Sequence, residues 1–579
     1  MKKFWKINKE KILLLLIIAL GAFLRLYSLN WDQNQHLHPD ERAITMFTLP
    51  LHFPSSISEF FSINSPLNPH FFAYGSLPLY LLKAVGSLVG IFYLSAASYD
   101  QINLIGRVIS VFFDLGTLFF IFLLGKKLFS KTVGLWGSFF YAISVFPIQA
   151  AHFYAVDTTL TFFVLLTLYV IIFFYEKPTK EKAVLIGILF GTSLATKTSA
   201  LVLVISIGVA LASDFILIFL KSPHRPKIWF PHVPKLLKIL FVEGVIIIIF
   251  TFIAFFIFEP YAFLSFQEFW KQTLEQSRMT RDAFTFPYTL QYVGKIPYLY
   301  ELKNIFFWGQ GPILATISLT GIFYAIFFII KKQKKEKWAQ ELILLIFLLS
   351  YFAVVGKFAV GWMRYMLPLY PLLCLFGAVL FYKIILILKS KIKSSLILNT
   401  LYLILYLTLL IWPLSFMHIY TKPNTRILAS KWIYENIPSN SIIAREHWDD
   451  GLPIGGTTTY KFLELPIYEM QNPFRETQIY QTIQEADCII IASNRLYAPL
   501  QKIADNCKKW NLPQERCPYN ANIYYKKLFN GKLGYKKVAE FKNPPTIPFL
   551  NVEINDQSAD ESFTVYDHPK IMIFKNEKI

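Results

Sequence analysis

Long apolar segments recur along the first part of this chain and constrain its fold more than any other feature. Crossing the hydrocarbon core of a bilayer takes roughly 20 apolar residues in a helix. We place such spans at residues 11–29, 104–125, 133–150, 157–175, 183–196, 199–220, 239–258, 308–330, 340–358, 363–386 and 396–418. The sequence therefore predicts an α-helical, multi-spanning membrane protein with about eleven transmembrane helices. A simple soluble enzyme is excluded, because only 16% of the residues are charged, against about 25% in soluble domains.

The basic residues indicate how these spans are oriented. The formal net charge is +20, but Lys and Arg gather in short clusters between apolar runs, as at Lys331, Lys332, Lys334, Lys335 and Lys337. Cytoplasmic loops keep such residues, so we expect no nucleic-acid partner. With the N-terminus in the cytoplasm, the inner segments hold 25 Lys and Arg residues and the three short outer turns hold 3. This bias predicts a multi-pass protein of the plasma membrane whose C-terminus lies outside the cell.

Two apolar runs need separate interpretation. The first, near residues 11–29, has a basic flank but no small-residue cleavage site, so we interpret it as a retained anchor. The run 76–95 contains Lys83 and a proline, Pro78, and we interpret it as a helix that lies at the membrane surface.

The remaining segments divide the chain into two parts. Residues 1–418 form the predicted transmembrane domain, with two long outer loops at 30–103 and 259–307. Long loops are uncommon in compact proteins unless they have a function. Residues 419–579 have apolar runs of only strand length, which indicates a small extracytoplasmic α/β domain. Cys507 and Cys517 in this domain could form a disulfide.

Acidic residues lie where two outer segments meet the membrane. Asp40 and Glu41 follow Pro39 soon after the first span, and an ionised carboxylate there could act as a general base. The alternative is a helix start, where proline and acidic residues are also favoured. Asp157 lies where the third span turns into the fourth, and it could instead be an N-cap. Because Asp40, Glu41 and Asp157 are all predicted at the outer face of the membrane, we expect them to belong to one site.

Three cations near the outer ends of spans could face an anion. Arg107 and Asp114 are seven residues apart in the second span and share a helix face. Buried charges of this kind line a cavity or pair with each other, although Arg107 could also snorkel to the surface. Lys197 and Arg364 could bind a phosphate group, or they could simply anchor their spans at the interface.

The tail contains one further acidic motif, His447-Trp448-Asp449-Asp450-Gly451. Adjacent aspartates could bind a metal or a sugar, but an Asp-Gly pair is also an ordinary turn, which we favour. His and Cys residues do not show zinc-ligand spacing, so the sequence predicts no metal site and no required cofactor.

Taken in order, several short motifs resemble a known family. They are His38-Pro39-Asp40-Glu41, Gly106-Arg107, His152 to Asp157, Gly191 to Lys197, Gly309-Gln310-Gly311-Pro312, and Arg364-Tyr365 with Pro368 and Pro371. The chain resembles the GT-C glycosyltransferases that use polyprenyl-phosphate sugars, namely protein O-mannosyltransferases, aminoarabinose transferases and their uncharacterised bacterial relatives. The resemblance covers roughly the first 420 residues.

The resemblance implies a role for each matched residue. Asp40 or Glu41 would deprotonate the acceptor hydroxyl, and Asp157 would help to position the acceptor or the sugar. Three cations would lie near the donor phosphate, and two histidines would position the acceptor or sugar; these are Arg107, Lys197, Arg364, His38 and His152. The tail does not resemble the β-trefoil of eukaryotic O-mannosyltransferases, which leaves open whether the acceptor is a glycan, a lipid or a protein.

A site on the outer face also constrains the donor. Nucleotide sugars are made in the cytoplasm, so the donor must be one that crosses the membrane, such as a polyprenyl-phosphate sugar. We therefore expect transfer of a single hexose or pentose, with mannose as one option, by one displacement that inverts the anomeric centre. The alternatives are a transporter or lipid-linked sugar flippase, a membrane scaffold, and an enzyme that moves a longer glycan. A transporter would usually contain paired repeats, which this sequence lacks.

Overall fold

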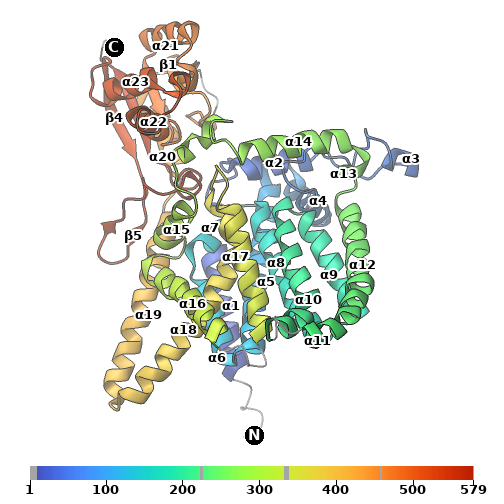
Figure 1. Cartoon of the computed structure of the whole chain (residues 1–579). Helices are drawn as coiled ribbons and strands as arrows, with labels where there is room; N and C mark the ends of the chain where they lie inside the picture. Colours follow the sequence, from blue (N-terminus) through green and yellow to red (C-terminus); the bar gives the residue numbers. More distant parts are fainter. Residues whose placement is uncertain (1–8, 222–225, 332–337, 457–458, 578–579) are drawn as a thin grey trace.

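The computed structural model describes residues 9–221, 226–331, 338–456 and 459–577. The basic cluster at 332–337 and residues 1–8, both predicted to be cytoplasmic, lie outside this described part. Helices form a bundle, and a small domain that contains a β-sheet lies at one end of it, while helix α1 (Lys9–Leu26) begins at the opposite end (Figure 1). The predicted combination of a helical domain and a C-terminal α/β domain is therefore confirmed.

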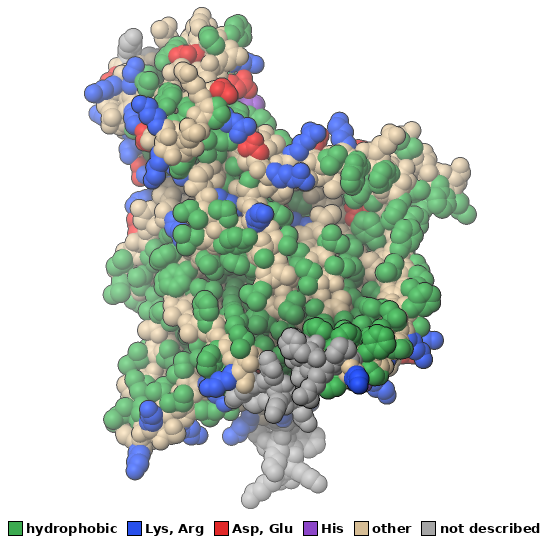
Figure 2. Space-filling view, viewed as in Figure 1, with side chains coloured by type: hydrophobic (Ala, Val, Ile, Leu, Met, Phe, Trp, Pro, Cys, Tyr) green, Lys and Arg blue, Asp and Glu red, His purple; other side chains and the backbone are tan. Residues whose placement is uncertain are grey.

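The bundle consists mainly of long apolar helices. They are α1 (Lys9–Leu26), α5 (Tyr99–Leu128), α6 (Lys131–Ala142), α7 (Val145–Ala151), α8 (Val156–Glu176), α9 (Lys180–Leu194), α10 (Leu203–Lys221), α12 (Val233–Phe258), α16 (Pro312–Lys331), α17 (Trp338–Val355), α18 (Tyr370–Lys391) and α19 (Ser395–Met417). On the face shown, their exposed side chains are mostly apolar over the middle of the bundle, with basic residues toward the end opposite the tail (Figure 2). This surface is the one expected of a protein that spans a membrane.

The predicted count of eleven spans is not confirmed. Seven helical segments of the described chain are long and apolar enough to cross a membrane, or eight if α6 and α7, which are bent by 61°, form one span. Helix α9 has only 15 residues. Helix α1 has four charged residues, namely Lys9, Glu10, Lys11 and Arg25. The protein is multi-spanning, and the orientation of its termini remains a prediction.

Close approach between bundle helices depends on glycine. A β-carbon on Gly125 of α5 would lie 2.6 Å from the α-carbon of Gly134 in α6. Gly187 and Gly191 of α9 would bring a β-carbon within 2.7 Å and 2.4 Å of backbone oxygens of α12. Small residues let helices pack backbone to backbone, which matters in lipid, where the hydrophobic effect does not drive helices together.

Short helices from the two predicted outer loops gather at the end of the bundle that carries the tail (Figure 1). They are α2 (Pro39–Thr48), α3 (Ile57–Phe60), α4 (Leu77–Gly90), α13 (Tyr261–Leu264), α14 (Phe266–Met279) and α15 (Leu299–Asn304). Helix α4 is apolar but shorter than a span, so its predicted location at the membrane surface stays a prediction. The remaining helix between α10 and α12 is α11 (Pro226–Trp229).

The tail is built on a five-stranded sheet in the order β2-β1-β3-β7-β4. Strands β2, β1 and β3 are parallel, and β7 is antiparallel to both β3 and β4. A separate hairpin pairs β5 with β6. The elements are α20 (Thr425–Asn436), β1 (Ile442–Glu446), β2 (Lys461–Leu465), α21 (Pro473–Glu485), β3 (Cys488–Ile491), α22 (Tyr497–Asn506), α23 (Tyr519–Phe529), β4 (Tyr535–Phe541), β5 (Thr546–Ile547), β6 (Val552–Glu553), α24 (Glu561–Thr564) and β7 (Ile571–Asn576).

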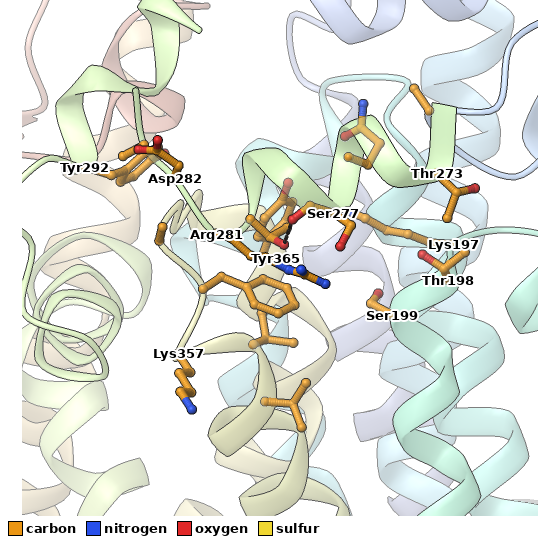
Figure 3. A pocket seen from close by; sticks show the side chains of 18 of the residues that line it. Lys197, Thr198, Ser199, Thr273, Ser277, Arg281, Asp282, Tyr292, Lys357 and Tyr365 are labelled. Atoms are coloured by element: carbon orange, nitrogen blue, oxygen red, sulfur yellow. Dashed lines mark hydrogen bonds between the residues drawn. The ribbon is translucent and has the colours of Figure 1, made fainter. Parts of the chain in front are cut away.

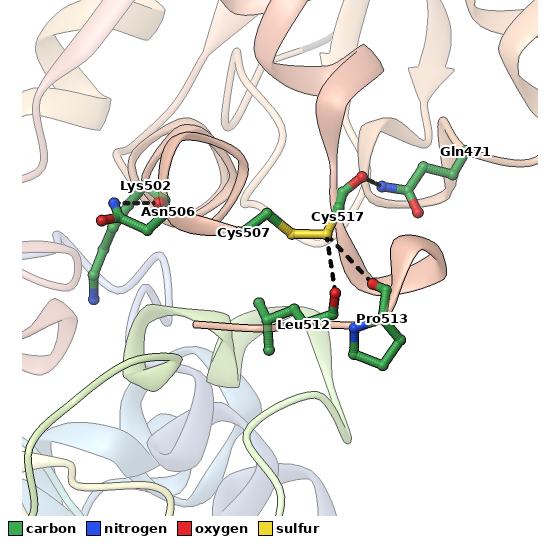
Figure 4. The surroundings of a disulfide bond; sticks show 7 residues. All are labelled: Gln471, Lys502, Asn506, Cys507, Leu512, Pro513 and Cys517. Carbon is green, nitrogen blue, oxygen red and sulfur yellow. Dashed lines mark hydrogen bonds between the residues drawn. A yellow bond between two sulfur atoms is a disulfide. The ribbon is translucent and has the colours of Figure 1, made fainter. Parts of the chain in front are cut away.

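One covalent bond braces the tail internally, and buried hydrogen bonds join the tail to the bundle. Cys507 and Cys517 form the disulfide that the sequence allowed, which ties the end of α22 to the segment before α23 (Figure 4). At the junction with the bundle, the Gln149 side chain donates to the Phe563 carbonyl at 2.8 Å and to Asp567 at 3.0 Å. The tail is therefore docked on the bundle through buried polar contacts.

Candidate active site

Asp40 and Glu41 lie in the first turn of α2. His38 caps this helix by accepting a hydrogen bond from the Glu41 backbone N–H at 3.4 Å, and Pro39 lies in the first turn. The interpretation of this motif as a helix start is thus correct. Successive side chains of an α-helix point about 100° apart, so the two neighbouring carboxylates enter different surroundings.

Glu41 belongs to a closed ionic cluster with Asp32 and Arg107, which we call the closed triad. Arg107 donates to both carboxylates, at 2.6 and 2.9 Å to Glu41 and at 2.8 and 2.9 Å to Asp32. Glu41 also accepts the backbone N–H of Tyr154 at 2.8 Å. All three side chains of the triad have no exposed surface. Arg107 and Glu41 are therefore occupied with each other and do not line a cavity.

Asp114 does not pair with Arg107, although the two share a helix face. It forms an ion pair with Arg25 of α1 and accepts a hydrogen bond from the Tyr141 hydroxyl at 2.5 Å. The pairing of Arg107 with Asp114, one of the alternatives that the sequence left open, does not form, because α1 supplies Arg25 as the partner of Asp114. Charges in the membrane need a partner, and each of these two finds one on another segment.

Asp40 has more open surroundings than Glu41. Its carboxylate pairs with Arg364 and accepts a hydrogen bond from the Tyr74 hydroxyl at 2.6 Å. The side chains of Asp40 and Arg364 are 16% and 13% exposed. Asp40 is therefore the acidic residue of this motif that a substrate hydroxyl could reach.

Asp157 and Lys197 form a second ion pair. The Lys197 ammonium lies 2.7 Å from Asp157, and it also lies over the Tyr365 ring, 4.5 Å from the ring centre. Asp157 is 3% exposed and Lys197 is 14% exposed. Ala155 is the residue at the N-cap position of α8, so the interpretation of Asp157 as the N-cap was wrong.

A cavity of about 1160 Å³ lies next to these pairs, and Lys197 is the member of the two pairs that lines it (Figure 3). Tyr74, Lys197 and Tyr365 line it, so Asp40 and Asp157 each lie one hydrogen bond behind its wall. Helix α14 contributes further lining side chains, including Thr273 and Ser277. The predicted acids thus converge on one cavity, but they act on it through a tyrosine and a lysine.

The same cavity has an apolar side between α10 and α17. Leu201, Val204 and Val354 line it there and are 59%, 51% and 45% exposed. Leu201 precedes α10 directly in a 3₁₀ helix, and Val354 is in the last turn of α17. An apolar opening between two helices of a membrane protein gives access to lipid. The cavity can therefore hold a polar group and an attached hydrocarbon chain at the same time.

The two histidines expected near the substrate are buried elsewhere. His38 packs between the rings of Phe153 and Tyr566, with ring centres at 4.4 and 4.2 Å, and burial holds the pKa of His38 well below its usual range. The two ring nitrogens of His152 face the carbonyls of Ile148 and Tyr27 at 2.9 and 3.0 Å. Neither histidine lines the cavity, so the structure does not bring them to the predicted site.

Sequence reasoning missed several residues at the site. Tyr74 connects Asp40 to the cavity, and Asp32 completes the closed triad. Glu259, the residue that follows α12 in the chain, also lines the cavity. Its side chain is 2% exposed, and burial raises the pKa of its carboxyl well above the usual value. The only signal for Glu259 was an acidic residue directly after an apolar run.

The acidic motif of the tail has a structural role. Asp450 pairs with Arg42 and Arg426, both at 3.2 Å, and Asp449 accepts a hydrogen bond from Ser493 at 2.6 Å. Within the described ranges, no group of three or more His, Cys, Asp or Glu side chains could hold a metal ion. The motif therefore connects the tail to the start of α2.

The fold and this cavity define a class: multi-spanning membrane proteins with a charged pocket that opens toward lipid. Residues 91–249 match the model of a family described as dolichyl-phosphate-mannose-protein mannosyltransferase. The matched range contains Arg107, Asp157 and Lys197. The resemblance to polyprenyl-phosphate-dependent glycosyltransferases, predicted from the sequence, is confirmed by this match. A search of curated proteins finds no match to the chain.

Solved structures of membrane glycosyltransferases overlap with the fold at low identity. The Archaeoglobus fulgidus oligosaccharyltransferase in the apo form has a TM-score of 0.49 at 13% identity and covers 86% of this chain and 71% of its own. ArnT from Cupriavidus metallidurans bound to undecaprenyl phosphate has a TM-score of 0.43 at 12% identity, covering 84% and 94%. The Saccharomyces cerevisiae Pmt1–Pmt2 complex bound to the sugar donor has a TM-score of 0.33 at 16% identity. The overlap covers 45% of this chain and 34% of that chain. At these scores the overlap assigns no role to any residue.

Proposed function

We propose that the protein is a membrane glycosyltransferase that moves one sugar from a polyprenyl-phosphate donor to an acceptor hydroxyl. The observation that carries this proposal is one cavity that Lys197 lines directly and that Asp40 and Asp157 approach through Tyr74 and Lys197, with an apolar side between α10 and α17. A donor of this kind has three parts, a sugar, a phosphate and a hydrocarbon chain, and the cavity offers matching surroundings for each.

The donor phosphate would lie near Lys197 and Arg364. These two cations flank Tyr365, because Lys197 lies over its ring and Arg364 precedes it in the chain. Cations in a partly buried site stabilise a departing phosphate more than they would in water. The polyprenyl chain would leave the cavity past Leu201 and Val354. The volume exceeds that of an ordinary ligand pocket, roughly 300–1,000 Å³, which suits a donor and an acceptor bound together.

Asp40 is the general base in this proposal. An acceptor hydroxyl that replaced the Tyr74 hydroxyl would donate its hydrogen bond to the same carboxylate oxygen. Asp40 would take the proton while the hydroxyl oxygen attacks the anomeric carbon and the phosphate leaves. One displacement inverts the configuration of the sugar. Asp157 would hold Lys197 in place, and Glu41 and Arg107, which the sequence offered as base and phosphate ligand, would support α2 instead.

The proposal names the sugar and the acceptor by chemical class. The sugar is a hexose or pentose, for which mannose is a reasonable first test given the family match to residues 91–249. The acceptor hydroxyl belongs to a glycan, a lipid or a protein. Leu512 and Arg516 of the tail line the cavity, so the tail is the part of the chain best placed to select an acceptor.

The test is to supply the purified protein in lipid vesicles with a panel of polyprenyl-phosphate sugars and a mixed envelope extract as acceptor. We expect release of free polyprenyl phosphate from one donor, an inverted anomeric configuration in the product, and continued activity in a metal chelator. A lipid-linked sugar flippase would move the donor across the vesicle membrane without cleaving it. Movement without cleavage for every donor in the panel would reject the proposal.

A further inference from the structure

The β5–β6 hairpin of the tail presents apolar side chains with nothing packed on them. Phe549 at its tip is 101% exposed, and Leu550 and Val552 are 70% and 51% exposed. Phe549 also has a φ of 65°, in the left-handed region that bulky residues rarely adopt. Glycine or asparagine would fit such a turn more easily. A phenylalanine at this position, with its ring pointing outward, therefore suggests that the ring has a binding partner.

The hairpin is held at one place on the bundle. The Asn543 side chain, which is 3% exposed, donates to the Ile419 carbonyl at 2.7 Å, just beyond the end of α19. Strand β5 contacts α19 itself. Lys542 and Glu553 form an ion pair across the base of the hairpin. In Figure 1 the hairpin extends from the sheet toward the bundle and ends beside the upper part of α19.

Helix α19 indicates what surrounds the hairpin tip. It is among the helices long and apolar enough to cross a membrane. One stripe along it, Leu403, Leu407, Ile411 and Leu414, is 42–57% exposed, and such a stripe on a spanning helix faces lipid. Trp412 lies in the last two turns of α19, and tryptophan is enriched where spanning helices meet the membrane–water interface. The apolar tip of the hairpin lies beside this end.

We propose that the β5–β6 hairpin is a membrane anchor that inserts Phe549 and Leu550 into the lipid interface beside α19. The bilayer is the partner because the tip continues the lipid-facing surface of a spanning helix. Since Asn543 joins the hairpin to the end of α19, the insertion would fix the tail over the bundle end that contains the cavity. The anchor does not depend on the proposed reaction, and it can be tested without any substrate.

The experiment uses an environment-sensitive fluorophore on the full-length protein in lipid nanodiscs. Phe549→Cys carries the label, and Phe474→Cys is the matched control. Phe474 is 76% exposed on α21, which lies at the far end of the tail from the bundle (Figure 1). The native cysteines do not compete, because Cys374 and Cys488 are buried and Cys507 is bonded to Cys517.

We expect the label at residue 549 to emit at shorter wavelength than at residue 474 and to be quenched at least threefold more by lipids with a nitroxide on the acyl chain. A label at 549 that behaves like the label at 474 would overturn the proposal. So would shielding at 549 that disappears on dilution of the nanodiscs without any lipid quenching, because a second copy of the chain would then cover the tip. Leu550→Cys repeats the measurement if Phe549→Cys fails to fold.

Discussion

The closed triad and the two ion pairs beside the cavity differ in exposure, and this difference distinguishes a structural role from a catalytic one. In the closed triad, Arg107 is shared by Asp32 and Glu41, and no surface of the three side chains is exposed. In the pairs at the cavity, Asp40 with Arg364 and Asp157 with Lys197, three of the four side chains keep 13–16% of their surface. Each cation there meets one carboxylate. A substrate could displace contacts in the open pairs but not in the closed triad.

The difference teaches that adjacency in sequence says little about role. Asp40 and Glu41 are neighbours in one helical turn, yet only Asp40 faces a partly open site. A buried charge that is fully hydrogen-bonded costs stability when its partner is removed, whereas an accessible charge can exchange partners during a reaction. Four predictions test this division, ordered by the expected effect on sugar transfer.

The largest effect is expected for Asp40→Asn. The amide has the shape of the carboxylate but cannot accept a proton, and a positioned general base typically contributes about 10²–10⁴-fold. We expect a loss of that size in the transfer rate, measured as polyprenyl phosphate released per folded molecule. Thermal unfolding of the variant should stay close to that of the parent, and unchanged transfer would remove Asp40 from the chemistry.

A smaller effect is expected for Lys197→Met. Hydrogen bonds to charged groups contribute about 1.5–3 kcal/mol, which corresponds to roughly a 10- to 100-fold loss of transfer. The loss should appear mainly in the KM for the donor, because the ammonium would contact its phosphate.

Lys357→Met is the matched control for Lys197→Met. Lys357 lines the same cavity but is exposed. We expect its removal to change transfer by less than about twofold, since exposed charges contribute little. Equal losses in the two variants would mean that the cavity attracts its ligand by general charge alone.

Glu41→Gln should affect stability more than transfer. The substitution removes a charge-assisted partner of Arg107 and leaves the Arg107–Asp32 pair in place, so we expect a loss of about 1.5–3 kcal/mol in the free energy of unfolding. Transfer per folded molecule should remain within a few-fold of the parent. If unfolding is unchanged while transfer is abolished, then Glu41 is the base and the division between the two ionic groups is wrong.

Much of the fold was predictable because it depends on composition over long segments. Apolar runs located most of the bundle helices, and apolar runs of only strand length indicated that the tail is an α/β domain. The number of spans was not predictable, since α9 is short and α6 bends into α7. Whether such segments cross the membrane depends on how neighbouring helices cover them, and a single sequence does not contain that information.

The site was predictable in part for a related reason. Asp40 and Asp157 could be selected from local sequence because each is an acidic residue at a point where a predicted outer segment meets an apolar span. The choice between Asp40 and Glu41 could not be made, because Arg107 lies 66 residues from Glu41 and Asp32 is 75 residues from Arg107. Tyr74 carries no local signal, since aromatic residues are common throughout this chain, and Tyr365 was noted only as part of the Arg364-Tyr365 motif.

The tail provides a second closed cluster and the smallest expected effect on transfer. His568 is fully buried between Asp567 at 2.5 Å and Asp556 at 3.0 Å, and Asp567 also accepts a hydrogen bond from Tyr420 at 2.8 Å. Burial alone would lower the pKa of His568, but the two carboxylates outweigh it and raise that pKa to about 10. His568 is thus a cation at neutral pH, and transfer near pH 7 should not depend on its titration.

This cluster predicts how the stability of the tail changes with pH. An unfolded histidine has a pKa near 6.5, so the folded state binds the extra proton between about pH 6.5 and 10. The stabilisation by His568 is fully present below pH 6.5 and is lost as pH rises through about 10. We expect the difference in thermal stability between the parent and His568→Gln to decrease as pH rises through this window. Groups that titrate in both proteins cancel in this difference. A difference that stays constant from pH 6 to pH 10 would show that His568 is neutral, and the junction would then be held by Tyr420 and Gln149 without a buried cation.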